Sequence, residues 1–183
     1  FATEALNAHQ RTLRMRGRPK IVLARSYEEA MELYEKYANN VLGVITDARY
    51  PRNGLVDPMA GIKLLGEIRK RDPFVPLILE SSEVNNKEYA RLYEASFVDK
   101  NSKKMNIDLR EIVSENFGFG DFVFRNPNTM EEVARVRNLK ELQNIIYSIP
   151  KESLLYHVQR NHVSRWLYSR AMFPAAEFLK QIT

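Results

Sequence analysis

One stretch, residues 41–51 (VLGVITDARYP), limits more than any other what this chain can fold into. It has five apolar or glycine positions in a row, then a carboxylate at Asp47 and a proline at Pro51. A continuous apolar run of this kind is typical of a parallel strand that is buried on both faces. Such a strand delivers the residue at its end to the carboxyl edge of the sheet, where α/β proteins place their sites. Asp47 is therefore a candidate site residue.

Short apolar runs alternate with helix-like segments over the first 116 residues. The predicted strands are residues 20–24, 41–45, 75–79 and 96–98, and the predicted helices are residues 27–37, 59–71, 86–94 and 107–116. Residues 1–15 have helical periodicity but no cap residue before them, so we expect a helix that begins upstream. This alternation predicts an α/β fold, with a parallel sheet and helices on both of its faces.

Length and composition narrow the class of protein. The 183 residues allow one domain of about 110 residues with an extension, and the content of 44% hydrophobic and 28% charged residues is that of soluble globular proteins. No apolar run approaches the roughly 20 residues of a membrane span, and no signal peptide pattern is present. We therefore expect a cytoplasmic protein without a membrane partner.

The absence of cysteine excludes disulfides, and the net charge of +5 is too small to predict a nucleic-acid partner.

Three polar groups follow three of the predicted strands. They are the carboxylate of Asp47, the hydroxyl of Ser81 with that of Ser82 beside it, and the ammonium of Lys100. Because the carboxyl ends of parallel strands share one edge of a sheet, these groups should lie together. A carboxylate can attack phosphorus, while a hydroxyl and an ammonium stabilise the charge on the phosphoryl oxygens. The sequence thus predicts a phosphoryl-acceptor site, which a divalent metal normally completes.

Five segments in this order resemble the receiver (CheY-like) domain of bacterial two-component response regulators. They are residues 24–30 (ARSYEEA), 45–51 (ITDARYP), 61–65 (GIKLL), 75–79 (VPLIL) and 97–100 (FVDK). The resemblance covers residues 1–116 and implies a receiver-like, flavodoxin-like sheet. It also implies a phosphoprotein in a phosphorelay, whose partner is a histidine kinase or a small phosphodonor.

The resemblance assigns a role to single residues. Asp47 corresponds to the phospho-acceptor and a Mg²⁺ ligand, the backbone carbonyl of Arg49 to a second metal ligand, Ser81 to the hydroxyl that turns toward the phosphoryl group, Phe97 to the switch aromatic, and Lys100 to the phosphate-pairing lysine. From spacing alone, Phe97 is instead a core residue.

A narrower resemblance covers most of the chain. Residues 13–20, 96–102, 117–125 and 156–162 are similar to the receiver-type region found ahead of phosphoenolpyruvate synthase or pyruvate phosphate dikinase-like modules in bacterial proteins. It implies a regulatory segment that is not itself an enzyme and that gives signal input to a downstream module of the same polypeptide. A second copy of the chain, in a homodimer, is a further expected partner. A fragment of the catalytic body of such a transferase is a further alternative.

The chain departs from the receiver pattern in three places, one of which is Asn101 after Lys100, where receivers generally have proline, so no cis peptide bond is expected there. Receivers have a central first strand that ends in two acids, and nothing before Lys20 matches it, so we expect that strand upstream. The strands at 20–24 and 41–45 should then not be adjacent, and the Mg²⁺ site would be incomplete without the upstream acids. The loop after Asp47, with Arg52, Asn53, Gly54 and Asp57 inserted, is longer than usual. The alternative to a phosphorylated receiver is a non-phosphorylated pseudo-receiver, acting as an interaction or dimerisation module.

Residues 117–183 predict a small α+β extension. A hairpin is expected from residues 121–125 and 132–136, followed by a helix that Asn138 and Glu141 cap, a long helix over residues 150–172, and a last helix that Pro174 opens.

The long helix holds His157, His162 and Trp166. The two histidines are five residues apart, which does not suit a zinc site on one helix face. His162 is expected to be a hydrogen-bonded, half-buried residue, with a phosphotransfer role for either histidine as the alternative. The extension has more apolar side chains than so small a unit should bury internally, so Trp166 is expected to anchor it to another surface.

Overall fold

A computed structural model describes residues 19–180. The helix predicted over residues 1–15 lies outside the described residues. By its internal contacts the described chain forms two compact units, one of residues 22–117 and one of residues 118–180 together with residues 19–21. None of the helices between residues 19 and 180 is long and apolar enough to cross a membrane.

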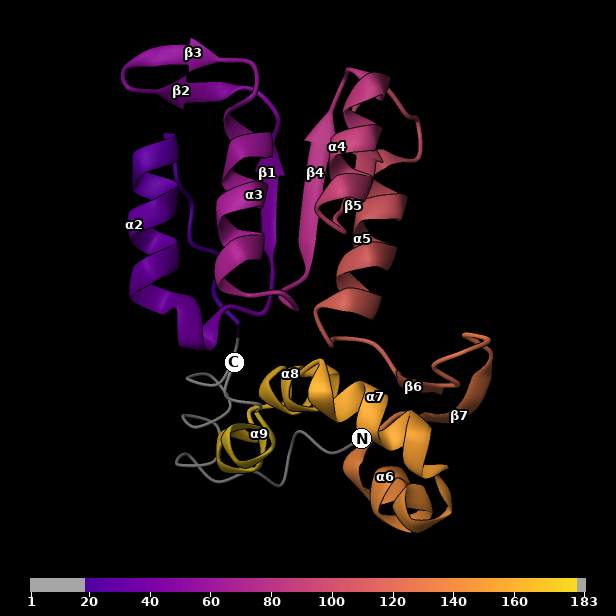
Figure 1. The fold of residues 1–183 in the computed structure, drawn as a ribbon. Coiled ribbons are helices and arrows are strands. Elements are labelled where there is room, and N and C mark those ends of the chain that lie inside the picture. Colours follow the sequence, from indigo (N-terminus) through magenta and orange to yellow (C-terminus); the bar gives the residue numbers. More distant parts are fainter. Residues whose placement is uncertain (1–18, 181–183) are drawn as a thin grey trace, which may run out of the picture. The chain divides into compact units, whose positions relative to one another are not determined.

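The first unit is built on a parallel sheet of three strands (Figure 1). These are β1 (Val44–Asp47), β4 (Leu77–Ser81) and β5 (Ser96–Asp99), in the order β1-β4-β5. The register pairs Asp47 with Glu80 and Ser81 with Asp99, so the polar strand ends meet at one edge. The predicted mixed α/β class with a parallel sheet is confirmed.

Helices pack against both faces of this sheet. They are α2 (Tyr27–Tyr37), α3 (Ala60–Arg71), α4 (Lys87–Leu92) and α5 (Met105–Asn116), with short 3₁₀ turns η1 (Ala38–Asn40) and η2 (Val84–Asn86). Leu77 and Leu79 of β4 join a core cluster with α2 and α3, whereas Ile78 joins Val98 and side chains of α5 in another. This alternation follows from the two-residue period of a strand, and it explains why the apolar run of β4 is continuous.

The prediction of a strand at residues 20–24 is wrong. These residues form no strand, and Ile21, Val22 and Leu23 are 97%, 54% and 72% exposed. A strand needs a neighbour for its backbone N–H and C=O groups. Within the described range β1 pairs with β4 alone and not with residues 20–24. The expected lack of direct pairing between these two segments is therefore observed, but apolar composition did not suffice to make residues 20–24 a strand.

The loop predicted after Asp47 is a hairpin. Strands β2 (Tyr50–Arg52) and β3 (Leu55–Asp57) pair in antiparallel fashion around a turn at Asn53 and Gly54. Both turn residues have positive φ, 52° and 76°, as the tight two-residue turn of a hairpin requires. The Asn-Gly pair is the sequence signal that identifies such a turn. The N–H of Asn53 donates to Oε1 of Glu28 at 3.0 Å, which ties the hairpin to α2.

The second unit begins with the predicted hairpin. Strands β6 (Phe122–Arg125) and β7 (Glu132–Val136) are antiparallel, and α6 (Leu139–Ile145), η3 (Ile146–Ser148), α7 (Lys151–Gln159), α8 (His162–Tyr168) and α9 (Phe173–Leu179) follow. The predicted cap of α6 is confirmed, because the N–H of Glu141 donates to Oδ1 of Asn138 at 2.9 Å.

The prediction of a single long helix over residues 150–172 is wrong. The chain forms two helices there, α7 and α8, and between them Asn161 has a φ of 58°. Asparagine adopts this left-handed conformation more readily than most residues. The break lets His157 of α7 and His162 of α8 meet through their Nδ1 atoms at 3.0 Å.

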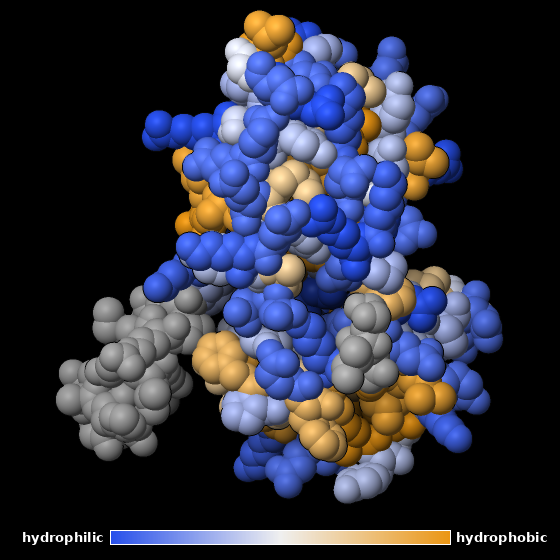
Figure 2. Space-filling view, turned by 60° about the vertical axis from the view of Figure 1, so that its left-hand side comes forward, coloured by the Kyte–Doolittle hydropathy of each residue, from blue (hydrophilic) through white to orange (hydrophobic). Residues whose placement is uncertain are grey.

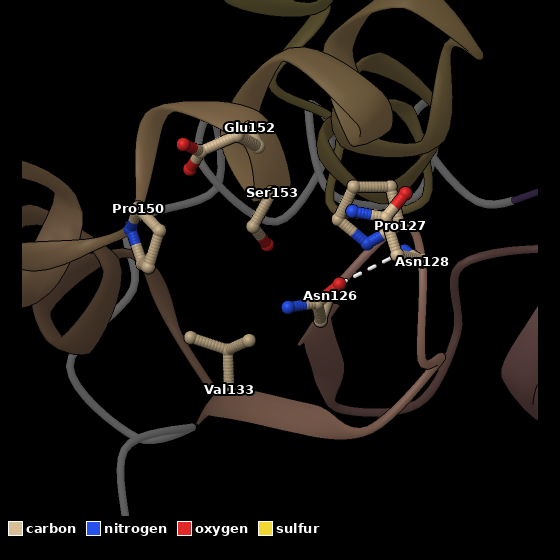
Figure 3. Close-up of a pocket in the computed structure, with 7 residues that line it drawn as sticks. All are labelled: Asn126, Pro127, Asn128, Val133, Pro150, Glu152 and Ser153. Carbon is tan, nitrogen blue, oxygen red and sulfur yellow. Dashed lines mark hydrogen bonds between the residues drawn. The ribbon is translucent and has the colours of Figure 1, made fainter.

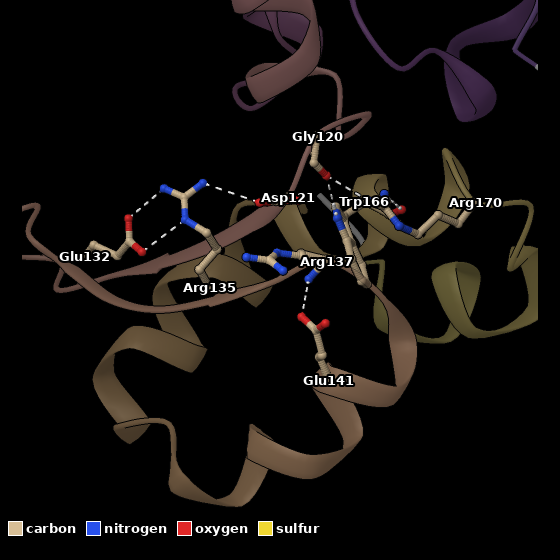
Figure 4. Close-up of polar contacts among 8 residues, drawn as sticks. All are labelled: Gly120, Asp121, Glu132, Arg135, Arg137, Glu141, Trp166 and Arg170. Atoms are coloured by element: carbon tan, nitrogen blue, oxygen red, sulfur yellow. Dashed lines mark hydrogen bonds and ion pairs between the residues drawn. The ribbon is translucent and has the colours of Figure 1, made fainter.

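Trp166 is the centre of the core of the second unit. It is 1% exposed and lies with its ring edge-on to Phe122. Figure 4 shows its indole N–H directed at the carbonyl of Gly120, a hydrogen bond of 3.0 Å. The same carbonyl accepts from Arg170, whose guanidinium lies 3.8 Å from the Trp166 ring centroid. The prediction that Trp166 anchors the extension to another surface is thus wrong, because Trp166 is buried within its own unit.

Other apolar side chains of the extension do stay at the surface. Phe178 is 88% exposed, and Leu155 and Phe173 are 44% and 43% exposed. Figure 2 shows such hydrophobic patches in orange between hydrophilic residues.

Candidate functional site

Three of the predicted site residues lie around one pocket of about 240 Å³ in the first unit. Asp47 ends β1, Ser81 ends β4, and Lys100 directly follows β5. The pocket is lined by Asp47, Ala48, Arg49, Pro58, Ser81, Ser82, Glu83 and Lys100. The structure therefore brings the predicted carboxylate, hydroxyl and ammonium together at the carboxyl edge of the sheet.

Asp47 and Lys100 form a direct ion pair. The Nζ of Lys100 contacts Oδ2 of Asp47, and the two side chains are 36% and 39% exposed. The N–H of Lys100 donates to the carbonyl of Ser81 at 2.9 Å, which holds the start of the loop beside β4. The other carboxylate oxygen, Oδ1, receives only a long contact of 3.4 Å from the N–H of Arg49. Oδ1 is thus the oxygen more open to a ligand.

The Ser81 hydroxyl is held in place by two donors. It accepts from the N–H of Glu83 at 3.0 Å and from Nδ2 of Asn86 at 2.9 Å. With both lone pairs engaged, its own proton remains available for donation. Ser81 and Asn86 are 3% and 6% exposed. Asn86 is a positioning residue that the sequence analysis missed, because nothing in the sequence relates it to a serine five residues earlier.

A second carboxyl group, that of Glu80, lies near the ion pair. It pairs in register with Asp47. Burial raises the pKa of Glu80 and the charge of Asp47 raises it further, while Lys100 opposes the shift. The strand predicted over residues 75–79 ends before Glu80, so this residue was not among the predicted site residues. The strand actually extends through Ser81.

Gly61 sets how closely α3 approaches the acceptor residue. Its N–H donates to the carbonyl of Ala48 at 3.0 Å. A Cβ at position 61 would lie 1.9 Å from the carbonyl oxygen of Asp47. A side chain does not fit here, so glycine lets the first turn of α3 pack directly on the backbone at the end of β1.

The predicted Mg²⁺ ligands, Asp47 and the carbonyl of Arg49, are not enough for a magnesium site. No group of three or more His, Cys, Asp or Glu side chains that could hold a metal occurs among residues 19–180, and Asp47 already contacts Lys100. Mg²⁺ prefers six oxygen ligands in octahedral geometry. The described residues therefore do not fit this ion without further ligands.

Phe97 is half-buried and packs against the cluster that contains Leu79 and α3. It is not among the residues that line the pocket. Its switch role stays a prediction.

The two histidines of the second unit form a neutral pair. His157 accepts the backbone N–H of Arg125 on Nε2 at 2.9 Å, so its proton is on Nδ1 and is donated to Nδ1 of His162. Burial lowers the pKa of His157 to about 4, with Arg125 and Arg160 contributing. Burial also lowers the pKa of His162 to about 3, with Arg165, His157 and Arg160 contributing. Both nitrogens of His157 are engaged in hydrogen bonds, which favours the structural role over phosphotransfer.

This pair predicts a loss of stability in acid. The unfolded chain binds protons at both histidines below their ordinary pKa of 6.5, while the folded unit keeps them neutral down to about 4 and about 3. The free energy of unfolding therefore has its full value above about pH 6.5, and it declines as the pH falls toward about 4. Urea unfolding at several pH values, followed by the fluorescence of Trp166, measures it. The double variant His157→Gln with His162→Gln should show a weaker pH dependence, and an equal dependence would contradict the prediction.

Comparisons of the whole chain with protein-family models, with curated proteins and with solved structures find no significant match.

Proposed function

We propose that this chain contains a receiver-like regulatory module that accepts a phosphoryl group on Asp47. One observation supports it above all: Asp47, Ser81 and Lys100 come from three different strands and line one pocket at the carboxyl edge of the sheet. A carboxylate with one open oxygen, a hydroxyl with a free proton and an ammonium make up the set of groups that phosphoryl acceptance needs.

In the proposed reaction, Oδ1 of Asp47 attacks the phosphorus of a phosphodonor. An O–P bond forms, the bond between phosphorus and the donor breaks, and its electron pair leaves with the donor. The product is an acyl phosphate. Lys100 moves its ammonium from the carboxylate to a phosphoryl oxygen, and Ser81 donates its hydroxyl proton to another. Positioned donors of this kind stabilise the charge that develops on the transferred group.

The same groups connect the reaction to the rest of the module. Transfer of the phosphoryl group replaces the single negative charge of the Asp47 carboxylate by a charge of about −1.5 to −2. Lys100 and Ser81 are therefore attracted toward the phosphoryl oxygens. Ser81 is hydrogen-bonded to Glu83 and Asn86, so its movement changes the loop that precedes α4. We propose that this change is passed to a downstream module of the same polypeptide. The phosphoenolpyruvate synthase-like nature of that module rests on sequence resemblance alone.

Phosphoryl uptake tests the proposal. Incubation with acetyl phosphate and magnesium should add the mass of one phosphoryl group to the wild-type protein, and Asp47→Asn should abolish the addition. Asp99→Asn is the matched control, because Asp99 ends β5, the strand on the other side of β4 from β1, and accepts the N–H of Asn101 in a turn. Its uptake should equal that of the wild type. Normal uptake by Asp47→Asn would place the acceptor elsewhere.

The second candidate is a pseudo-receiver that serves only as an interaction or dimerisation module. The ion pair between Lys100 and Asp47 favours it, because the carboxylate is already partly neutralised. So does the incomplete set of metal ligands among the described residues. Wild-type protein that self-associates in sedimentation but takes up no phosphoryl group would support this candidate.

A further inference from the structure

A second pocket lies in the unit of residues 118–180, between the turn that joins β6 to β7 and the N-terminus of α7 (Figure 3). Its volume is about 240 Å³. The lining residues are Asn126, Pro127, Asn128, Val133, Pro150, Glu152 and Ser153. None of them belongs to the phosphoryl-acceptor site.

Ser153 is the residue that points to a ligand. It is 1% exposed, and among residues 19–180 its hydroxyl is the one buried side-chain polar atom without a hydrogen-bond partner. Figure 3 shows this oxygen pointing into the pocket. Burying a hydroxyl without a partner is unfavourable, and native proteins seldom leave such a group unsatisfied. A local cost of this kind is expected where a site requires it.

The start of α7 adds further donors to the pocket. No side chain caps this nine-residue helix, and Pro150 precedes it. The N–H groups of Lys151, Glu152 and Ser153 therefore have no acceptor within the helix, and they form its positive end.

Asn126 completes the set of donors. Its Oδ1 accepts the N–H groups of Asn128 at 2.8 Å and Thr129 at 3.3 Å. This fixes the orientation of the amide, and Figure 3 shows its nitrogen turned toward the pocket. Nδ2 of Asn126, the buried Ser153 hydroxyl and the N–H groups at the start of α7 are donors that an acceptor group of a ligand can engage.

We propose that this pocket binds a small monocarboxylate, an acid with a short apolar body. The convergent donors suit the two oxygens of a carboxylate, and the side chains of Val133, Pro127 and Pro150 supply apolar walls. No Lys or Arg side chain lines the pocket, and Glu152 adds one negative charge. A doubly charged phosphate is therefore disfavoured relative to a singly charged carboxylate.

Titration of the ¹⁵N-labelled 183-residue chain with butyrate tests the proposal. Saturable shifts are expected for the amides of Lys151, Glu152 and Ser153 and for the side-chain NH₂ of Asn126. Butyramide, which has the same shape without the charge, and inorganic phosphate should bind at least about tenfold more weakly. Equal binding of either probe, or no saturable shift with butyrate, would overturn the assignment.

Variants separate binding from stability. Ser153→Ala should weaken butyrate binding by about tenfold or more, while its melting temperature stays equal or rises, because an unpartnered hydroxyl is removed. Asn126→Asp keeps the acceptor of the turn but replaces the Nδ2 donor, so binding should be lost.

Ser164→Ala is the matched control. Ser164 is 3% exposed, but its hydroxyl donates to the carbonyl of Asn161 at 3.1 Å. This variant should melt at a lower temperature and bind butyrate as the wild type does. A Ser153→Ala protein that melts lower with unchanged binding would make Ser153 a structural residue and refute the proposal.

Discussion

Replacing Trp166 with alanine is expected to lower the free energy of unfolding of the unit of residues 118–180 by about 3–5 kcal/mol. The ring is 1% exposed, lies edge-on to Phe122 and covers the guanidinium of Arg170. Its removal leaves a cavity that the surrounding helices fill only in part. The carbonyl of Gly120 on one side of this cavity loses its hydrogen bond from Trp166 and keeps the one from Arg170. Urea unfolding followed by far-ultraviolet circular dichroism measures the loss.

Two further variants separate packing from hydrogen bonding. Trp166→Phe keeps an aromatic ring but loses the donor to Gly120, whose carbonyl still accepts from Arg170; its cost should be clearly smaller than that of alanine. Phe178→Ala removes a ring that is 88% exposed and should change stability by less than about 0.5 kcal/mol. A loss below about 1 kcal/mol for Trp166→Ala would mean that this core is not the main source of stability in the unit.

Gly61→Ala is expected to destabilise the first unit by about 3 kcal/mol or more, at the upper end of what overpacking costs. The added Cβ would lie 1.9 Å from the carbonyl oxygen of Asp47, and backbone atoms on both sides cannot rotate out of the way. The first turn of α3 must therefore move away from β1. Because Asp47 is the proposed acceptor, phosphoryl uptake should fall together with stability.

Gly66→Ala is the matched control on the same helix. There an added Cβ meets the Tyr93 side chain at 3.1 Å, and a side chain can shift where a backbone carbonyl cannot. Alanine also favours a helix over glycine by about 1 kcal/mol. Chemical denaturation should thus show a much smaller change for Gly66→Ala, and an equal loss in both variants would show that α3 tolerates no alanine for a reason other than the contact with Asp47.

The sequence predicted those parts of the fold that depend on local pattern. The apolar runs that became β1, β4 and β5 were recognisable as strands, and β4, which is buried on both faces, needs no polar alternation. The cap at Asn138 was also recognisable, because one side-chain oxygen and the N–H three residues later suffice to define it.

The parts that sequence reasoning missed depend on neighbours distant in the chain or on a single backbone angle. Residues 20–24 have strand composition but form no strand, since strand formation requires a pairing partner. The break at Asn161 depends on one left-handed residue inside an otherwise helical pattern. The roles of Asn86 and Glu80 arise only after β4 and its loop are folded. The same holds for Ser153, whose position in a helix gave no sign that its hydroxyl would be buried without a partner.

The edge position of β1 has a consequence for how the chain behaves at high concentration. Within the described residues only one side of this strand is paired, and Val44, Ile45 and Thr46 carry neither charge nor proline. Ile45 is 45% exposed. Natural sheets commonly protect such an edge with lysine, proline or a bulge, because an open ladder of N–H and C=O groups accepts a strand from another molecule. The open side of β1 is therefore a place where a strand of a second molecule can add to the sheet, and dilution disfavours such an association.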